Sequence, residues 1–389
     1  MNRICIQDSE FVDRVKNAQA LMIEQGVDLM FVFGNEAEPQ FVRYLSDYWP
    51  SFETAAIIFA QKGDPVLLIG PETLTFATDR SRIKNIKQVK CLRESSNPDY
   101  PGLQLDTLAD VIESITSGGI AVAAVAGYNL IPKIVFDEFE AAVGKFGKVK
   151  IVRGDELLME LRMIKTPSEL ACLREAAKIT AAAMKFTIEN AKPGMTEQQV
   201  RGLGLQVIHE QGGEGEAFAF WSLAGQGSDQ AISRSRSKVI QPEDYLHIGV
   251  SARYEGYVAS IGRGVFFGKP ISWIADAIKA AYEAQSAIIA ELRAGNNAGN
   301  VARAYKKSLS RTGHDSMLLY GPCHATGLME GEPPWIEDDS DYLLRENMCY
   351  CTDIFLGKGG YGLRVEDSVR VGETCAENMT SFPKEIFIK

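Results

Sequence analysis

The sequence predicts a two-domain α/β (α+β) protein, and three observations lead to that prediction. The chain has 389 residues, of which 46% are hydrophobic, which is enough to build two packed domains. In the first 155 residues strand patterns alternate with helical patterns, as in a three-layer α/β domain. From residue 156 onward, helical patterns surround one long β-hairpin at residues 245–268.

The first half begins with a helix at residues 9–26, where Phe11, Val15, Ala18 and Met22 recur at helical spacing and Gly26 ends the pattern. The hydrophobic patterns that follow predict strands at residues 28–33, 55–60, 65–69 and 120–125. They predict further helices at residues 72–79, 103–116 and 131–143. A polar and aromatic segment lies between the first helix and the second strand, with candidate interface residues Arg43, Tyr44, Tyr48, Trp49 and Phe52.

The boundary between the domains is expected near residues 153–165, so the predicted domains are residues 1–155 and 156–389. A helix start follows this boundary. Thr166 can cap free amides, Pro167 suits the first turn, and Glu169 closes a capping box. A second capping pair, Thr196 and Gln199, starts the next helix.

The hairpin at residues 245–268 is rich in Val, Ile, Tyr and Phe, and Glu255-Gly256 supplies its turn. Two helices are expected after it, at residues 271–292 and 301–312. A final strand pattern at residues 348–353 ends at Asp353.

The charge and the cysteines exclude several classes of function. A net charge of −10 argues against nucleic acid as a partner. The apolar runs are too short to span a membrane, and the N-terminus does not read as a signal peptide. The seven cysteines form no CxxC pattern, which favours a reduced, cytoplasmic protein. Cys323, beside His324, is the one candidate nucleophile among them, although buried packing is the more common role.

Five separated motifs resemble one known family. They are Arg162-x-x-Lys-Thr-Pro-x-Glu169, Pro193-Gly-x-Thr-Glu197, the hairpin, Gly321-Pro-Cys-His324 through Pro334, and Arg364-x-Glu-Asp367. Together they resemble the family of methionine aminopeptidase, prolidase, aminopeptidase P and creatinase. That resemblance implies a creatinase/prolidase-type α/β domain at residues 1–155 and a pita-bread domain at residues 156–389. It also implies a homodimer, in which the N-terminal domain can lend residues to a neighbour's site.

The resemblance locates the metal ligands of the family at five positions of this chain, and two of the five have lost their ligand. The positions are Gly249, Ser260, His324, Asp353 and Glu366. Glycine has no donor atom, and a serine hydroxyl is a poor ligand for a hard divalent ion. The two-metal centre is therefore predicted to be lost and no cofactor is expected. Gly331 also replaces the second histidine of the family.

The preferred interpretation is a metal-independent hydrolase of a small C–N substrate, such as an amidine, an amide or a dipeptide. His324, with His247, would move protons, while Glu366 and Asp353 would orient the base or hold a cationic group. In one variant Ser260 is the nucleophile. The expected substrate-binding residues are Arg234, Arg236 and Arg364 as carboxylate clamps, with Tyr257, Arg263 and Glu332, which match the family.

Two other interpretations remain open. The lost catalytic positions are consistent with a retired enzyme that acts as a binding protein, in which the retained polar residues form internal salt bridges. Alternatively, His324, Asp353 and Glu366 hold a single divalent ion in an Xaa-Pro peptidase, although Asp353 is about 1.5 Å shorter than the glutamate of the family.

Overall fold

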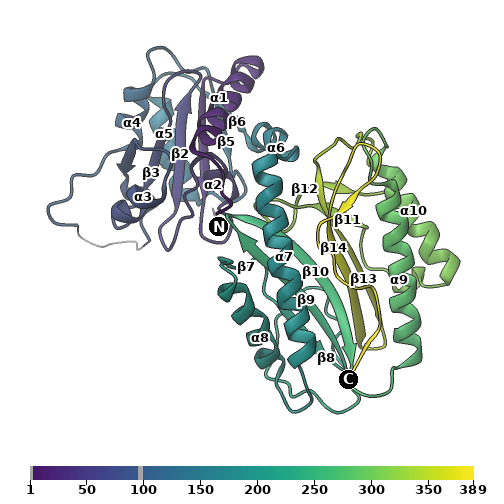
Figure 1. The fold of residues 1–389 in the computed structure, drawn as a ribbon. Coiled ribbons are helices and arrows are strands. Elements are labelled where there is room, and N and C mark those ends of the chain that lie inside the picture. The colour runs from purple at the N-terminus through teal and green to yellow at the C-terminus, as the bar shows by residue number, and fades with distance from the viewer. Residues whose placement is uncertain (1–2, 95–99) are drawn as a thin grey trace. The chain divides into compact units, whose positions relative to one another are not determined.

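The computed structural model describes residues 3–94 and 100–389. The chain divides into two compact units, Ile6–Arg162 and Met163–Lys389, and the segment before Ile6 joins the second unit. Helix α6 (Asp155–Met163) lies within the region 153–165 where the boundary was expected, and the units divide near its end, seven residues after residue 155. Each unit has its own sheet and hydrophobic core (Figure 1).

The first unit is a six-stranded mixed sheet with the order β4-β3-β2-β1-β5-β6. On β1, alternate side chains such as Phe31 and Phe33 pack with α4 and α5 in one core. Its described elements are α1 (Asp8–Gln25), β1 (Leu29–Gly34), α2 (Gln40–Ser46), β2 (Ala55–Ala60), β3 (Val66–Ile69), α3 (Leu74–Arg80), β4 (Ile86–Gln88), a 3₁₀ turn (Lys90–Leu92), α4 (Leu108–Ile115), β5 (Val122–Ala126), α5 (Lys133–Gly144), β6 (Lys150–Arg153) and α6.

The predicted strands and helices of this unit are present, with two differences. The helix expected at residues 103–116 begins only at Leu108, because Thr107 and Asp110 form a capping box there. The short elements α2, β4 and β6 were not predicted, since each is too short to show a clear periodicity.

The second unit contains a ten-stranded sheet whose main path is β12-β11-β13-β14-β10-β9-β7. Its described elements are α7 (Pro167–Asn190), α8 (Glu197–Glu210), β7 (Gly215–Glu216), β8 (Trp221–Ala224), β9 (Tyr245–Tyr254), β10 (Tyr257–Phe266), α9 (Ser272–Glu291), α10 (Ala298–Thr312), a 3₁₀ turn (Asp315–Met317), β11 (Cys323–Ala325), β12 (Glu332–Ile336), β13 (Cys349–Lys358), β14 (Tyr361–Arg370), β15 (Glu377–Asn378) and β16 (Phe387–Ile388).

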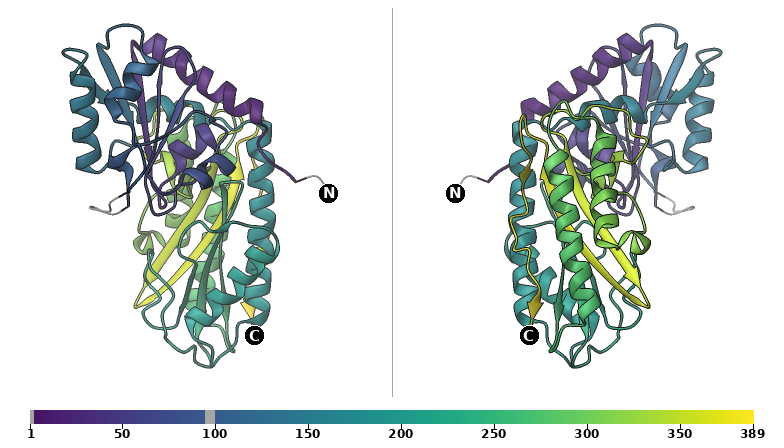
Figure 2. Two further views of the ribbon diagram at one scale, coloured as in Figure 1. Left: turned by 90° about the vertical axis from the view of Figure 1, so that its left-hand side faces the viewer. Right: turned by 90° about the vertical axis from the view of Figure 1, so that its right-hand side faces the viewer.

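Helices cover one face of this sheet. Ile248 and Val250 of β9 pack with α7 and α8, whereas Ile354 and Val365 of β13 and β14 pack with α9 and α10. Figure 2 shows α9 and α10 lying along the yellow strands. Because side chains alternate along a strand, the residues between these apolar ones point to the other face.

The two predicted capping boxes are present, with reciprocal hydrogen bonds between Thr166 and Glu169 and between Thr196 and Gln199. They start α7 and α8 at the positions expected from the sequence. Among the described residues, no helix is both long enough and apolar enough to cross a membrane.

Candidate active site

Three neighbouring strands bring the retained histidine and glutamate together on the face opposite the helices. His324 of β11 pairs with Cys351 of β13. Glu366 lies on β14, the next strand, which pairs with β13. Their apolar neighbours, such as Ala325 and Val365, point into the helix-covered core. The strand alternation therefore places all three polar side chains on one face.

Glu330, from the loop between β11 and β12, completes a group that we call the four-residue cluster: His324, Glu330, Cys351 and Glu366. One ligand atom from each of these residues lies within 4.8 Å of those of the other three. Cys351 and Glu366 are buried, whereas the side chains of His324 and Glu330 are 14% and 21% exposed. Glu330 is therefore the member most open to solvent.

Hydrogen bonding fixes the histidine of the cluster. His324 Nδ1 lies 3.2 Å from its neighbour, the carbonyl oxygen of Ala325, and Nε2 lies 3.4 Å from Glu330 Oε1. When Nδ1 carries the proton and donates to this carbonyl, Nε2 is left facing the cluster. This arrangement lets Nε2 accept a proton or bind an ion.

The two glutamates are held close together in a buried environment. Burial and the charge of Asp353 raise the pKa of Glu330 to about 7. Burial, Asp353 and Glu330 raise the pKa of Glu366 well above its usual value. Neither oxygen of Glu366 receives a hydrogen bond from a donor in the described part of the chain, so its contact with Glu330 is favourable only if a proton or a cation lies between them.

Asp353 does not join the cluster, because Arg364 and Tyr320 bind it. Arg364 Nη1 lies 2.5 Å from Asp353 Oδ2, and the Tyr320 hydroxyl donates to the same oxygen at 2.7 Å. Arg364 also donates to the carbonyl of Ala231 and lies 4.2 Å over the Trp221 ring. The guanidinium expected to hold a substrate carboxylate is thus already paired inside the protein.

The Trp221 ring fills the space next to Gly249. A Cβ atom on Gly249 would lie 2.8 Å from Cε3 of that ring, closer than real side chains approach. Ser260 is fully buried beside Glu330 and brings no carboxylate. With Asp353 paired to Arg364, the residues present do not fit the two-metal centre implied by the resemblance.

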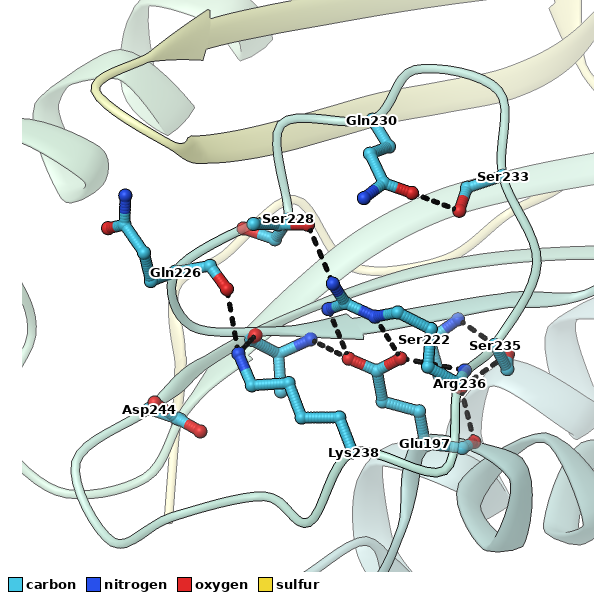
Figure 3. Close-up of polar contacts among 12 residues, drawn as sticks. Glu197, Ser222, Gln226, Ser228, Gln230, Ser233, Ser235, Arg236, Lys238 and Asp244 are labelled. Carbon is cyan, nitrogen blue, oxygen red and sulfur yellow. Dashed lines mark hydrogen bonds and ion pairs between the residues drawn. The ribbon is translucent and has the colours of Figure 1, made fainter.

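The loop between β8 and β9 carries the other two expected clamps, and Figure 3 shows one of them, Arg236. Arg236 binds the buried Glu197 through Nε and Nη2, at 2.8 and 2.6 Å, and donates to the carbonyl of Gly227. This bidentate pair anchors the loop to the start of α8. Arg234 is exposed on the same loop.

Three other expected substrate-binding residues have partners outside the cluster. Arg263 pairs with Asp367 at 2.9 Å and Tyr257 donates to Glu169 at 2.7 Å, both on the helix-covered face. Each lies three residues from Ser260 on β10, an odd number, so the strand alternation points it the other way. Glu332 pairs with Lys165 at 3.3 Å. All three therefore form ion pairs or hydrogen bonds within the protein.

His247 lies on the site face of β9 but is completely buried. Burial, together with the positive charge of Arg364, lowers its pKa to about 3. The imidazole is therefore neutral at physiological pH and is a weak base, in contrast to the proton-transfer role expected from the sequence.

Two of the candidate interface residues in the first unit, Arg43 and Trp49, contact each other. The Arg43 guanidinium lies 5.0 Å over the Trp49 ring, and the Phe52 side chain is 83% exposed at a positive φ of 57°. Tyr48 is buried in that unit.

Sequence reasoning did not single out Glu330, Cys351 or Trp221 as site residues. For Cys351 a signal was present, because it precedes Asp353 by two residues and shares its strand face. Glu330 lies on a loop, where no periodicity predicts the direction of a side chain. The stacking of Trp221 next to Gly249 depends on the pairing of β8 with β9.

Comparison with known proteins agrees with this architecture. Residues 171–373 match the model of metallopeptidase family M24, and residues 14–164 match the creatinase/prolidase N-terminal domain. An uncharacterized peptidase of Bacillus subtilis, YqhT, is 23% identical, covering 96% of this chain and 99% of that protein. The Xaa-Pro dipeptidase of Pyrococcus furiosus is 24% identical, with the same coverage.

Among solved structures, the prolidase of Thermococcus sibiricus superimposes with a TM-score of 0.84 at 19% identity, covering 97% of this chain and 99% of that one. At this level of identity the likeness establishes the fold. The mixed α/β architecture with a pita-bread second domain, expected from the sequence, is thereby confirmed.

Proposed function

Because the chain belongs to metallopeptidase family M24, a family of hydrolytic enzymes, and carries the creatinase/prolidase N-terminal domain, we propose that it hydrolyses a carbon–nitrogen bond in a small substrate. The observation that supports this proposal is the four-residue cluster, with Glu330 at its open side next to His324. The names of several relatives, Xaa-Pro dipeptidases, make a dipeptide-sized amide the first substrate class to test.

The reaction needs groups that move protons. Hydrolysis adds the hydroxyl of water to the carbonyl carbon, breaks the C–N bond and gives the leaving nitrogen a proton. Glu330 is the cluster member best placed for this, because its side chain is the most exposed of the four and its Oε1 lies 3.4 Å from His324 Nε2. In this proposal Glu330 takes the proton from water and returns it to the nitrogen.

The family's two-metal route is not part of the proposal. Gly249 and Ser260 supply no carboxylate, and Asp353 is paired with Arg364. A strictly metal-independent form, expected from the sequence, is supported by the direct contact of His324 with Glu330, through which a proton can pass. A form with one metal ion is argued in the next subsection.

A second candidate is a retired enzyme acting as a binding protein. It is favoured by the internal ion pairs that occupy Arg236, Arg263, Arg364 and Glu332. In this candidate, the residues that the sequence predicted to bind substrate form structural ion pairs instead. This candidate predicts ligand binding without turnover.

A hydrolysis screen separates the two candidates. The panel contains Xaa-Pro dipeptides, other dipeptides, and linear and cyclic amidines. Under the hydrolase proposal, wild type cleaves one class and Glu330→Gln lowers kcat by roughly 100-fold or more. The control Glu210→Gln, on the exposed end of α8, keeps full activity. Turnover that survives Glu330→Gln unchanged contradicts the proposed role, and an inert wild type that still binds a panel member favours the binding protein.

A further inference from the structure

The four-residue cluster has the geometry and the donor set of a site for one transition-metal ion. We infer that His324, Glu330, Cys351 and Glu366 bind a single ion of the zinc type, with Cys351 as a thiolate ligand. The inference names the ion of the site proposed above and rests on that proposal for its use in hydrolysis. With all four ligands bound the ion has no open position, so hydrolysis requires Glu330 to leave the ion, which frees it to act as the base. Binding itself can be measured without any substrate.

The distances suit one tetrahedral ion. Zinc binds sulfur at about 2.3 Å and nitrogen or oxygen at about 2.0–2.2 Å, so its ligand atoms lie roughly 3.3–3.8 Å apart. The four candidate atoms already lie within 4.8 Å of one another. Three of them come from the hydrogen-bonded strands β11, β13 and β14, which hold their positions. Small side-chain rotations would close the remaining gap.

The carboxyl groups in and around the cluster outnumber the arginine beside them, because Asp353, Glu330 and Glu366 lie near Arg364 alone. Glu330 and Glu366 bring two carboxyl groups to one buried place, and the nearest guanidinium, Arg364, is already bound to Asp353. Its Nη1 lies 3.6 Å from Glu366 Oε2, too far for a good hydrogen bond. Both Glu366 oxygens are fully buried and lack a donor among residues 3–94 and 100–389. A buried carboxylate without such a partner is costly, and a bound cation removes that cost.

The surroundings orient the ligands as in known metal sites. The Ala325 carbonyl can accept the Nδ1 proton of His324, which directs Nε2 into the cluster. The Ser368 hydroxyl lies 3.6 Å from Cys351 Sγ, where it can donate to a thiolate. Backbone carbonyls and hydroxyls in such positions fix the ligating atoms and tune their basicity.

The thiol determines which ion is preferred. Thiolate and imidazole favour zinc and cobalt over magnesium, calcium and manganese. The five positions at which the resemblance places ligands would bring only oxygen and nitrogen atoms. The site inferred here keeps two of these positions, His324 and Glu366, and adds Glu330 and Cys351. On binding, the Cys351 thiol releases its proton to solvent.

A cobalt titration tests the inference without an activity assay. Protein freed of metal with a chelator is titrated with Co²⁺, and its absorption is recorded. We expect one Co²⁺ per chain, a near-ultraviolet band from thiolate-to-cobalt charge transfer, and the visible bands of a tetrahedral ion. Zinc should displace the cobalt and remove these bands.

Single-residue variants identify which side chains bind the ion. Cys351→Ser should remove the charge-transfer band, and His324→Ala and Glu366→Gln should each weaken binding by roughly 10-fold or more. Two cysteine variants serve as matched controls and should keep the band. Cys323→Ser changes the neighbour of His324 that points into the core, and Cys375→Ser removes an exposed thiol. Circular dichroism confirms that each variant is folded.

Three results would overturn the inference: the absence of stoichiometric binding, a band that persists in Cys351→Ser, or a band that disappears in Cys375→Ser. A chelated protein that hydrolyses its substrate at full rate would leave the proposed function standing without the ion. Stoichiometric cobalt with the Cys351 band, in a protein that cleaves no substrate, would support the site and contradict the function.

Discussion

Arg364 holds Asp353 through a buried ion pair, with 2.5 Å between Nη1 and Oδ2. The two side chains are 3% and 8% exposed, so neither can exchange its partner for water. The same guanidinium stacks on Trp221 and binds the loop carbonyl of Ala231. The Arg364 guanidinium therefore contacts a strand of the site, an aromatic ring and a loop at the same time.

Removing this cation should cost stability, and removing its partner as well should restore part of it. Arg364→Met leaves Asp353 buried without a charge partner, and we expect a loss of about 3–5 kcal/mol in the free energy of unfolding. The double variant Arg364→Met/Asp353→Asn should recover a good part of that loss. Urea unfolding of the wild type, both single variants and the double variant measures the coupling. Additive effects would contradict the importance of the pair.

The close approach of Trp221 makes position 249 intolerant of a side chain. Gly249→Ala places a Cβ atom against the indole, and we expect overpacking to cost about 1–3 kcal/mol. Gly118→Ala is the matched control, because a Cβ there meets no atom within 4 Å. Thermal unfolding of both variants gives the comparison. Equal stability of the two would mean that the ring moves aside easily.

Protonation of His247 should destabilise the fold in acid. In the unfolded chain this imidazole takes up a proton near pH 6.5, but in the folded protein only near pH 3. Between these values the unfolded state binds more protons, so stability falls as the pH falls. From pH 7 to 5 this group should cost up to about 2 kcal/mol.

A His247→Leu variant isolates that contribution. It removes the titrating group while keeping an apolar side chain next to Phe355. Urea unfolding across this pH range should show a smaller loss for the variant than for the wild type. Parallel curves for the two proteins would show that His247 is not held neutral.

The cysteines should differ widely in reactivity. Cys375 is exposed, whereas Cys323 is buried and burial raises its pKa well above that of a free thiol. Iodoacetamide should modify Cys375 first in the native protein and leave Cys323 unmodified until unfolding. Peptide mass spectrometry reads out both sites. Rapid native labelling of Cys323 would revive its candidacy as a nucleophile.

The Arg236–Glu197 pair should control the mobility of its loop. Glu197→Gln keeps the shape of the side chain but weakens the bidentate pair, which should speed amide exchange at residues 226–236 by roughly 10-fold or more. Glu210→Gln on the same helix is the control. Hydrogen–deuterium exchange measures both variants. Unchanged amide exchange in the loop would mean that the hydrogen bonds from Trp221 to the Ser233 carbonyl and from Arg364 to the Ala231 carbonyl are sufficient to hold it.

Local sequence signals predicted much of the fold because they act over a few residues. The Thr166–Glu169 and Thr196–Gln199 boxes begin helices where the sequence placed them, and the hairpin turns at Glu255-Gly256. Strand alternation could also have separated Ser260 from Arg263. Resemblance had placed both in one site, and the structure places them on opposite faces of the sheet.

The composition of the site was less predictable, since it depends on contacts distant in sequence. The pairing of Arg364 with Asp353 follows from the register of β13 with β14. Glu330 joins the four-residue cluster because of the path of the loop between β11 and β12. No sequence motif predicts the Arg364–Asp353 pair or the position of Glu330. His324 and Glu366, by contrast, lie in recognisable motifs, and the structure brings them together.

The packing of Trp221 next to Gly249 has an evolutionary consequence. An aspartate at position 249 needs the ring to leave, yet the ring supports Arg364, and Arg364 occupies the carboxylate of Asp353. A single substitution that adds a carboxylate at position 249 is therefore expected to lower stability before any metal ligand is gained. Positions 249 and 353 are thus coupled through Trp221 and Arg364, and a carboxylate ligand at position 249 requires several substitutions to occur together.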